Sequence, residues 1–170
     1  MVLSGAAMLS DRQEEINNLN VFPVPDGDTG INMSLTMSTI SGTPDGLTVG
    51  ESAEKIASLM LRSARGNSGA ILSLFFRGIA KSLKGLEMAS AEDIAIALKR
   101  GTEEAYKAVM QPTEGTILTV MRVCSEKAVE KVSQGKYKYN PTALFSYILK
   151  TGEKTLAKTP ELLPVLKEAN

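Results

Sequence analysis

Apolar side chains recur along most of the chain with the three- and four-residue spacing that is typical of amphipathic helices. The clearest case is the segment 67–85, which predicts a helix packed against a core. Its apolar face is a row at four-residue spacing made by Ile71, Phe75, Ile79 and Leu83.

Two more long helices follow from the same pattern. One begins at about Ser90, where Ser90 and Asp93 have the spacing of a capping box, and continues to about Val109. The other covers roughly 116–132, and we expect its lone Cys124 to fill the core. Its apolar row is Ile117, Met121, Cys124, Ala128 and Val132.

Shorter helical patterns complete the chain, and strand signals are nearly absent. The helical patterns cover 9–19, 31–40, 51–64, 141–157 and 160–168, the last beginning at Pro160. Only 21–24 alternates like a strand, and its two prolines favour an extended loop. The sequence therefore predicts one all-α domain over 1–170, an antiparallel bundle of about seven or eight amphipathic helices joined by short turns.

Composition narrows the classes of function. The 170 residues are 43% hydrophobic, which is enough to close a core, and 19 Lys and Arg balance 19 Asp and Glu. This balance leaves no excess of positive charge to bind the phosphate backbone of a nucleic acid, so we expect no nucleic-acid partner. No apolar run approaches the ~20 residues that span a bilayer, and the opening MVLSGAAML lacks a charged signal region. We expect a cytoplasmic protein with no membrane span.

The chain has one cysteine and no histidine, which excludes several chemistries. An internal disulfide, a thiolate or imidazole zinc site and a histidine general base all lack their residues. Any metal should therefore be hard and oxygen-bound, and phosphoryl chemistry would use carboxylates, hydroxyls and backbone amides.

The segment 20–34 carries the first candidate site. Asp26 and Asp28 stand two residues apart in a glycine-rich turn, where their oxygens could share one Mg²⁺. Thr29, Asn32 and the first amides of the following helix lie beside that position. The alternative is a simple turn in which Asp28 or Thr29 caps the helix.

Two later loops also end in helix starts. In 64–69, free amides and glycines suit a phosphate, and the Arg65 guanidinium could donate two further hydrogen bonds to it. The alternative is that Ser or Asn simply caps the helix. The amide-bearing residues are Gly66, Asn67, Ser68 and Gly69. In 111–120, Gly115 and Thr116 precede a helix that Thr116 could merely cap.

Three common motifs are excluded. An EF-hand counted from Asp26 needs Gly and Glu where Ile31 and Met37 stand. The Gly-Lys-Ser/Thr phosphate loop is absent, because the Gly-Lys at 135–136 is followed by Tyr137. The protein-kinase set lacks its His and its Asp-Phe-Gly triplet.

Together, NVFPVPDGDTGINMSLTM, ARGNSGAILSLFFRG and AYKAVMQPTEGTILTV resemble, in order, the L-subunit (DhaL-type) family of dihydroxyacetone kinases and its relative, the N-terminal domain of bacterial fatty acid kinase. The resemblance implies a barrel of eight antiparallel helices with ATP or ADP and two Mg²⁺ at one end. Asp26 and Asp28 match two of the family's three acidic metal ligands. The third falls near Asn20, which offers a neutral oxygen, so either the second metal binds more weakly or Asn20 suffices.

The resemblance also implies roles for the other loops. The turn from Gly66 to Gly69 matches the phosphate-contacting turn, Thr116 lies among the ribose or phosphate neighbours, and Asn32 stands at the family's Asn position. The form VFPVPDGDTG is similar to fatty acid kinase, whose acceptor is an acyl carboxylate presented by a separate fatty-acid-binding carrier protein (DegV-like), giving an acyl phosphate. The alternatives are a dihydroxyacetone kinase subunit and a non-catalytic nucleotide-binding regulatory module.

The same resemblance bears on the extent of the protein. The sequence stops at LPVLKEAN, before the Asp-Ala/Ser-Gly-Gly segment and the closing helix expected from the family. We therefore expect the N-terminal part of a longer polypeptide, with further domains that could recruit the carrier and form a homodimer. Alone, the domain is expected to be catalytically inactive.

Overall fold

A computed structural model of the chain describes residues 1–42 and 45–168. Within those ranges every regular element is helical, which confirms the all-α prediction. The helices are α1 (Val2–Asp11), α2 (Gln13–Asn18), α3 (Thr29–Ser38), the 3₁₀ helix η1 (Thr39–Gly42), α4 (Val49–Ser63), α5 (Gly66–Leu83), α6 (Ala91–Tyr106), α7 (Ile117–Ser133), α8 (Pro141–Leu156), α9 (Thr159–Leu162) and α10 (Val165–Glu168).

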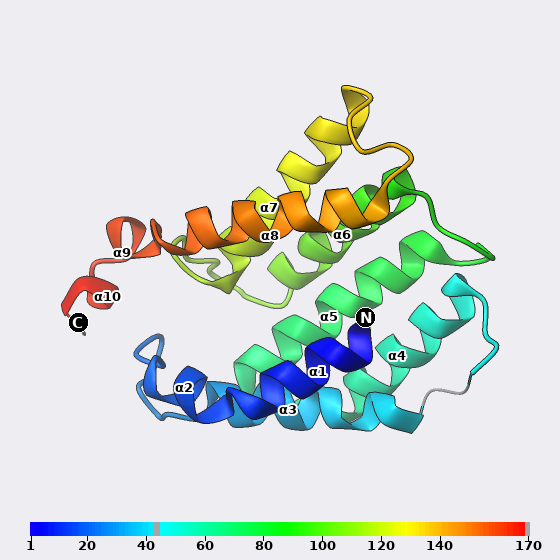
Figure 1. Cartoon of the computed structure of the whole chain (residues 1–170). Coiled ribbons are helices and arrows are strands. Elements are labelled where there is room, and N and C mark those ends of the chain that lie inside the picture. Colours follow the sequence, from blue (N-terminus) through cyan, green and yellow to red (C-terminus); the bar gives the residue numbers. More distant parts are fainter. Residues whose placement is uncertain (43–44, 169–170) are drawn as a thin grey trace.

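The helices from α3 to α8 run alternately in opposite directions and are joined by turns at the two ends of the bundle (Figure 1). They pack largely in chain order, α4 on α5, α5 on α6, α6 on α7 and α7 on α8, while α1 and α2 pack against α3. Helix α3 also packs on α5. The predicted antiparallel bundle is therefore confirmed, and α5 is the helix shared by its two halves.

The predicted long helices are confirmed to within a few residues, and their starts have the expected chemistry. The Ser90 hydroxyl accepts from the Asp93 N–H at 3.1 Å, while the Ser90 N–H donates to the Asp93 carboxylate at 2.8 Å. A second capping box, which the pattern did not predict, begins α4 with Thr48 and Glu51. Each box satisfies amides that have no partner within the helix.

Two predicted elements are wrong in detail. The helix expected over 9–19 is divided at Arg12 into α1 and α2. Helix α1 also begins earlier than expected, at Val2, because the uncharged first residues lack the polar face by which an amphipathic helix is predicted. The helix expected over 160–168 is two short helices. Pro164 lacks an N–H and disfavours a helical conformation in the preceding residue, and Leu163 is extended at φ −130° and ψ 100°.

The buried side chains form two clusters, one in each half of the bundle. The cluster between α3, η1, α4 and α5 consists of Met37, Ile40, Met60 and Leu72. The cluster between α6, α7 and α8 consists of Ala91, Ala95, Ala128, Val132 and Leu144. Half-buried Cys124 lies at the α7–α8 contact, where its thiol donates to the Ile148 carbonyl at 3.6 Å. As expected, it serves in packing, and burial raises its pKa.

Helices α5 and α6 meet backbone to backbone at Gly78 and Gly101. A Cβ atom on Gly78 would lie 2.5 Å from the Arg100 carbonyl oxygen and 2.6 Å from the Gly101 Cα. A Cβ atom on Gly101 would lie 2.7 Å from the Phe75 carbonyl oxygen. Any side chain larger than hydrogen would therefore push the two halves of the bundle apart.

An ion pair adds a second link between the same helices. Lys81 of α5 donates to the Glu104 carboxylate of α6 at 2.9 Å, and Lys107 donates to its other oxygen at 2.8 Å. These bonds lower the pKa of Glu104 to about 2, so the carboxylate stays charged throughout the neutral and mildly acidic range.

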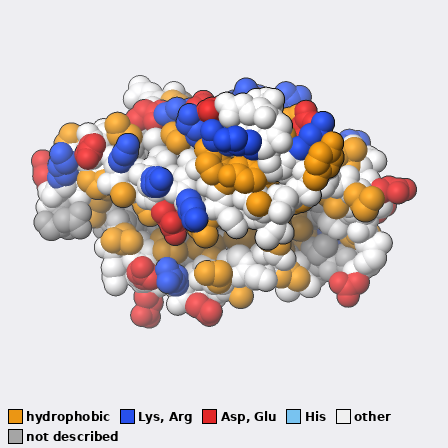
Figure 2. Space-filling model, turned by 45° about the horizontal axis from the view of Figure 1, so that its top comes forward, with side chains coloured by type: hydrophobic (Ala, Val, Ile, Leu, Met, Phe, Trp, Pro, Cys, Tyr) orange, Lys and Arg blue, Asp and Glu red, His pale blue; other side chains and the backbone are white. Residues whose placement is uncertain are grey.

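The outer surface carries mixed charge. On the face that Figure 2 shows, basic, acidic and apolar side chains alternate. Among the described residues, no helix combines the length and the apolar character that crossing a membrane requires.

We predict that Gly78→Ala lowers the free energy of unfolding by roughly 1–3 kcal/mol, because the new methyl group meets only backbone atoms, which cannot move aside. Urea denaturation measures the change. The control is Gly5→Ala in α1, where nothing lies within 4 Å and the substitution should be neutral or stabilising. A Gly78→Ala protein as stable as the wild type would contradict the close crossing.

Candidate functional site

The turn before α3 presents two carboxylates with no protein partner. Asp28 is the N-cap residue of α3, yet its side chain makes no capping hydrogen bond. Among the described residues, neither Asp26 nor Asp28 has a side-chain hydrogen bond or an ion pair. Asp26 is exposed and Asp28 is partly exposed. The alternative in which Asp28 serves as the cap is therefore wrong, and both carboxylates are available to a cation.

Two asparagine side chains hold this turn instead. The Asn17 side-chain oxygen accepts the N–H groups of Gly30 at 2.8 Å and Ile31 at 3.2 Å. The Asn20 side-chain oxygen accepts from the Asp28 N–H at 3.3 Å, and its amide donates to the Val24 carbonyl at 3.1 Å. Asn20, predicted as a metal ligand, is thus engaged within its own turn. No sequence pattern pointed to Asn17, because its partners lie 13 and 14 residues away.

The start of α5 has unpaired backbone donors. Its N-cap residue is Arg65, which makes no capping bond, and Asn67 and Ser68 lie inside the first turn rather than at the cap. In the described chain, no side chain accepts the N–H groups of Gly66, Asn67 or Ser68. Side chains of Thr48, Ser90, Thr116 and Asn140 cap the other four long helices. The uncapped start of α5 is therefore suited to an anion.

The first turn of α3 and the start of α5 lie side by side. A Cβ atom on Gly66 would overlap the Asn32 side-chain amide, and one on Gly69 would overlap the Thr36 hydroxyl. The Arg65 N–H donates to the buried Thr36 hydroxyl at 3.1 Å, and that hydroxyl donates to the Asn32 carbonyl at 2.7 Å. Two of the three predicted loops are thus brought together, at one end of the bundle (Figure 1).

The third loop lies at the same end of the bundle but contacts a different helix (Figure 1). Thr116 caps α7: its hydroxyl accepts from the Leu118 N–H at 3.3 Å and donates to the Thr113 carbonyl at 2.9 Å. Gly115 adopts φ +84°, and a Cβ there would lie 2.6 Å from the Leu163 Cβ. The structure thus places Gly115 against the end of α9, and the hydrogen bonds of Thr116 stay within its own loop and helix, with none to Asp26 or Asp28 among the described residues.

Glu114 anchors that third loop. Its carboxylate accepts from Arg122 at 2.7 Å and from the Thr119 hydroxyl at 2.7 Å, and Thr119 in turn accepts the Gly115 N–H at 2.8 Å. Tyr106 donates to the other carboxylate oxygen at 3.3 Å. The hydrogen bond from Arg122 lowers the pKa of Glu114. Sequence reasoning missed this network, because its partners come from different elements.

The donor set fits Mg²⁺. Among the described residues, no three acidic, His or Cys side chains gather into a metal site, and Asp26 and Asp28 are the two carboxylates that the turn before α3 carries. Mg²⁺ is commonly held by one or two carboxylates together with phosphate and water oxygens. Two unpaired carboxylates before α3, at the same end of the bundle as the uncapped start of α5, have the oxygen donors that such a site requires.

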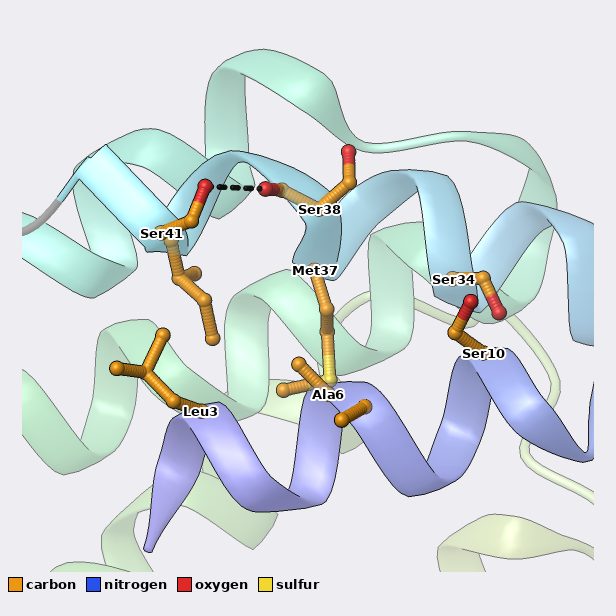
Figure 3. A pocket seen from close by; sticks show the side chains of 9 residues that line it. Leu3, Ala6, Ser10, Ser34, Met37, Ser38 and Ser41 are labelled. Atoms are coloured by element: carbon orange, nitrogen blue, oxygen red, sulfur yellow. Dashed lines mark hydrogen bonds between the residues drawn. The ribbon is translucent and has the colours of Figure 1, made fainter.

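The hollows in the surface are separate from these residues. One, of about 250 Å³, lies between α1 and α3, where Met37 points toward Ala6 and the Ser41 hydroxyl donates to the Ser38 carbonyl at 3.1 Å (Figure 3). Another, of about 300 Å³, lies between α4 and α5. Neither of these two hollows is lined by a predicted site residue.

Comparisons with known proteins agree over nearly the whole chain. The model of the family described as DAK2 domain matches residues 23–170. An uncharacterised protein of Staphylococcus saprophyticus is 44% identical over 99% of this chain, and Protein YloV of Bacillus subtilis is 43% identical over 99%. A Staphylococcus aureus protein is 42% identical over 99% of the chain. The chain spans only 30% of the length of the first two and 31% of the third.

Replacing Glu114 by Gln should lower the free energy of unfolding at neutral pH by roughly 1 kcal/mol, since Arg122 loses its charged acceptor. Because the folded-state pKa of Glu114 lies below its ordinary 4.5, its contribution is present above that pH and is lost as the pH falls through the folded-state value. Denaturation from pH 7 to pH 3 measures this.

The control is Glu126→Gln, which removes a longer 3.5 Å pair with the same arginine. We expect a smaller loss there. A deficit in Glu114→Gln that stays constant down to pH 3 would contradict the ionic role.

Proposed function

Because this chain belongs to the DAK2 domain family, whose members are kinase-type nucleotide-binding domains, we propose that it binds Mg-ATP or Mg-ADP where α3 and α5 begin. The observation that carries the proposal is the pairing of two free carboxylates with an uncapped helix start. Asp28 stands at the N-cap of α3 without capping it, and the Asn32 side chain of the same helix lies against Gly66 of α5.

Each predicted residue has a role in this proposal. Asp26 and Asp28 hold Mg²⁺, while Asn20 fixes the turn and offers a neutral oxygen to a second ion. When bound, Mg²⁺ neutralises phosphate charge. The backbone N–H groups at the start of α5 bind phosphate oxygens, with Arg65 beside them. The remaining contacts to the nucleotide come from Thr29, Asn32, Gly66, Asn67, Ser68, Gly69, Gly115 and Thr116.

The proposed reaction is transfer of the γ-phosphate to a fatty acid carboxylate. A carboxylate oxygen forms the new bond to phosphorus, the bond to the ADP oxygen breaks, and no proton is moved, so no general base is needed. This chemistry suits a chain without histidine. Leu19 and Val24, in the same loop as the carboxylates, are 68% and 58% exposed, and a carrier with an apolar acyl chain would cover them.

A separate carrier protein would bring the acceptor to this domain. The proposed partner is a fatty-acid-binding carrier protein (DegV-like). Because the relatives extend well beyond the matched 30%, we propose that further domains of the same polypeptide recruit the carrier and support a homodimer. A dihydroxyacetone-loading subunit is the alternative acceptor partner, and a regulatory module that binds nucleotide without turnover is the alternative to catalysis.

Asp26→Ala and Asp28→Ala should each weaken Mg-ATP binding at least about tenfold, since each removes one of two charged metal ligands. Isothermal titration calorimetry with and without Mg²⁺ measures the effect. Asp45→Ala, in the exposed turn before α4, is the matched control and should bind as the wild type does. Unchanged affinity in both variants would remove the metal role.

The acceptor is identified by product analysis. A polypeptide that carries this domain together with the remaining part of a longer relative is incubated with ATP and either a fatty-acid-loaded carrier or a dihydroxyacetone-loaded subunit. We expect acyl phosphate, and we expect none from Asp28→Ala. Dihydroxyacetone phosphate would favour the second kinase, while nucleotide binding with neither product would favour the regulatory module.

A further inference from the structure

We propose that Asn17 is a positioning residue for the metal-binding turn: it caps α3 in place of Asp28 and so leaves the Asp28 carboxylate free for a cation. The inference rests on the proposed function, because it explains how that function's metal ligand is kept available. It concerns a residue in a different helix, α2, which precedes the turn.

At the start of α3, the side chain of Asn17 rather than that of Asp28 accepts the capping hydrogen bonds. An N-cap Asp ordinarily accepts the N–H of the second or third helical residue with its own side chain. Here those residues are Gly30 and Ile31, and both N–H groups donate to the Asn17 side-chain oxygen, at 2.8 and 3.2 Å. Asp28 makes no capping bond. The donors that would otherwise hold its carboxylate are already satisfied.

The main chain of Asn17 also contacts the turn. Its carbonyl accepts the Asn20 N–H at 3.1 Å, and it lies 4.0 Å from the position that a Cβ on Gly27 would occupy. Gly27 has φ +65° and separates the two carboxylates. Asn17 thus makes hydrogen bonds at both ends of the turn and lies close to its middle.

Close packing keeps α2 beside α3. Gly30 is buried, and a Cβ there would overlap the Gln13 carbonyl of α2. This contact packs the start of α2 against α3, and Asn17, one turn further along α2, lies within reach of the α3 amides. The amide is also neutral, so it satisfies the donors without adding negative charge next to Asp26 and Asp28 or neutralising either of them.

Removing the Asn17 side chain should therefore turn the Asp28 carboxylate onto the first amides of α3. In Asn17→Ala, the N–H groups of Gly30 and Ile31 lose their acceptor, and the Asp28 carboxylate is the nearest side chain in sequence able to cap them. We expect the Mg²⁺ concentration for half-maximal ATP binding to rise about tenfold. Asn17→Asp keeps an acceptor and should bind no more than about threefold more weakly than the wild type, because the cap is restored and the added negative charge does not repel a cation.

Asn140→Ala is the matched control. The Asn140 side chain accepts the Ala143 N–H at 2.9 Å and caps α8 at the opposite end of the bundle (Figure 1). Its loss removes a comparable cap far from the turn and should leave the Mg²⁺ dependence unchanged. A double variant, Asn17→Ala with Asp28→Ala, should bind no more weakly than Asp28→Ala alone, because Asn17 acts through Asp28.

Wild-type affinity in Asn17→Ala, or an equal loss in Asn140→Ala, would overturn the proposal. Failure of the wild type to show Mg-dependent binding would instead contradict the proposed function. A metal-free crystal structure of Asn17→Ala then decides the inference separately. An Asp28 carboxylate turned onto the Gly30 or Ile31 N–H supports it, and a carboxylate still without a partner overturns it.

Discussion

Helix α5 approaches α3 at its first turn and α6 further along its length, and both approaches depend on glycine. Gly66 and Gly69 lie against Asn32 and Thr36 of α3, while Gly78 meets the α6 backbone. At these positions, a methyl group would overlap a neighbour or lie at most 2.6 Å from its backbone. This constraint joins the two halves of the bundle, and it also places the start of α5 beside the turn that carries the carboxylates.

The position of the candidate site depends on which helix starts have a side-chain cap and which do not. Side chains cap α4, α6, α7 and α8, and each cap accepts one N–H of the first turn. At α3 the cap comes from Asn17, which leaves Asp28 unpaired, and at α5 no side chain acts as a cap. The unpaired carboxylates before α3 and the uncapped start of α5 therefore lie at the same end of the bundle. Such an arrangement is complementary to a metal bound to phosphate oxygens.

Periodicity could predict the long helices because their apolar rows are regular, and the Ser90 cap because its partner is three residues away. It could not predict α1, whose opening residues carry no charge, or the division at Pro164. The positions of the loops of the candidate site could also be predicted, since Gly, Asp, Asn and Ser gather there before helix starts. What the sequence could not show is which side chain caps which helix. Asn17 and Glu114 act through distant partners or through partners from several elements, and no short motif encodes such contacts.

We propose that Asp26, Asp28 and the start of α5 form one Mg-nucleotide site, which a crystal structure with Mg²⁺ and a non-hydrolysable ATP analogue would test. We expect Mg²⁺ with carboxylate oxygens of Asp26 and Asp28 at about 2.0–2.1 Å. We also expect phosphate oxygens within hydrogen-bond distance of the N–H groups of Gly66, Asn67 or Ser68. Nucleotide bound elsewhere, with both carboxylates still lacking a metal, would contradict it.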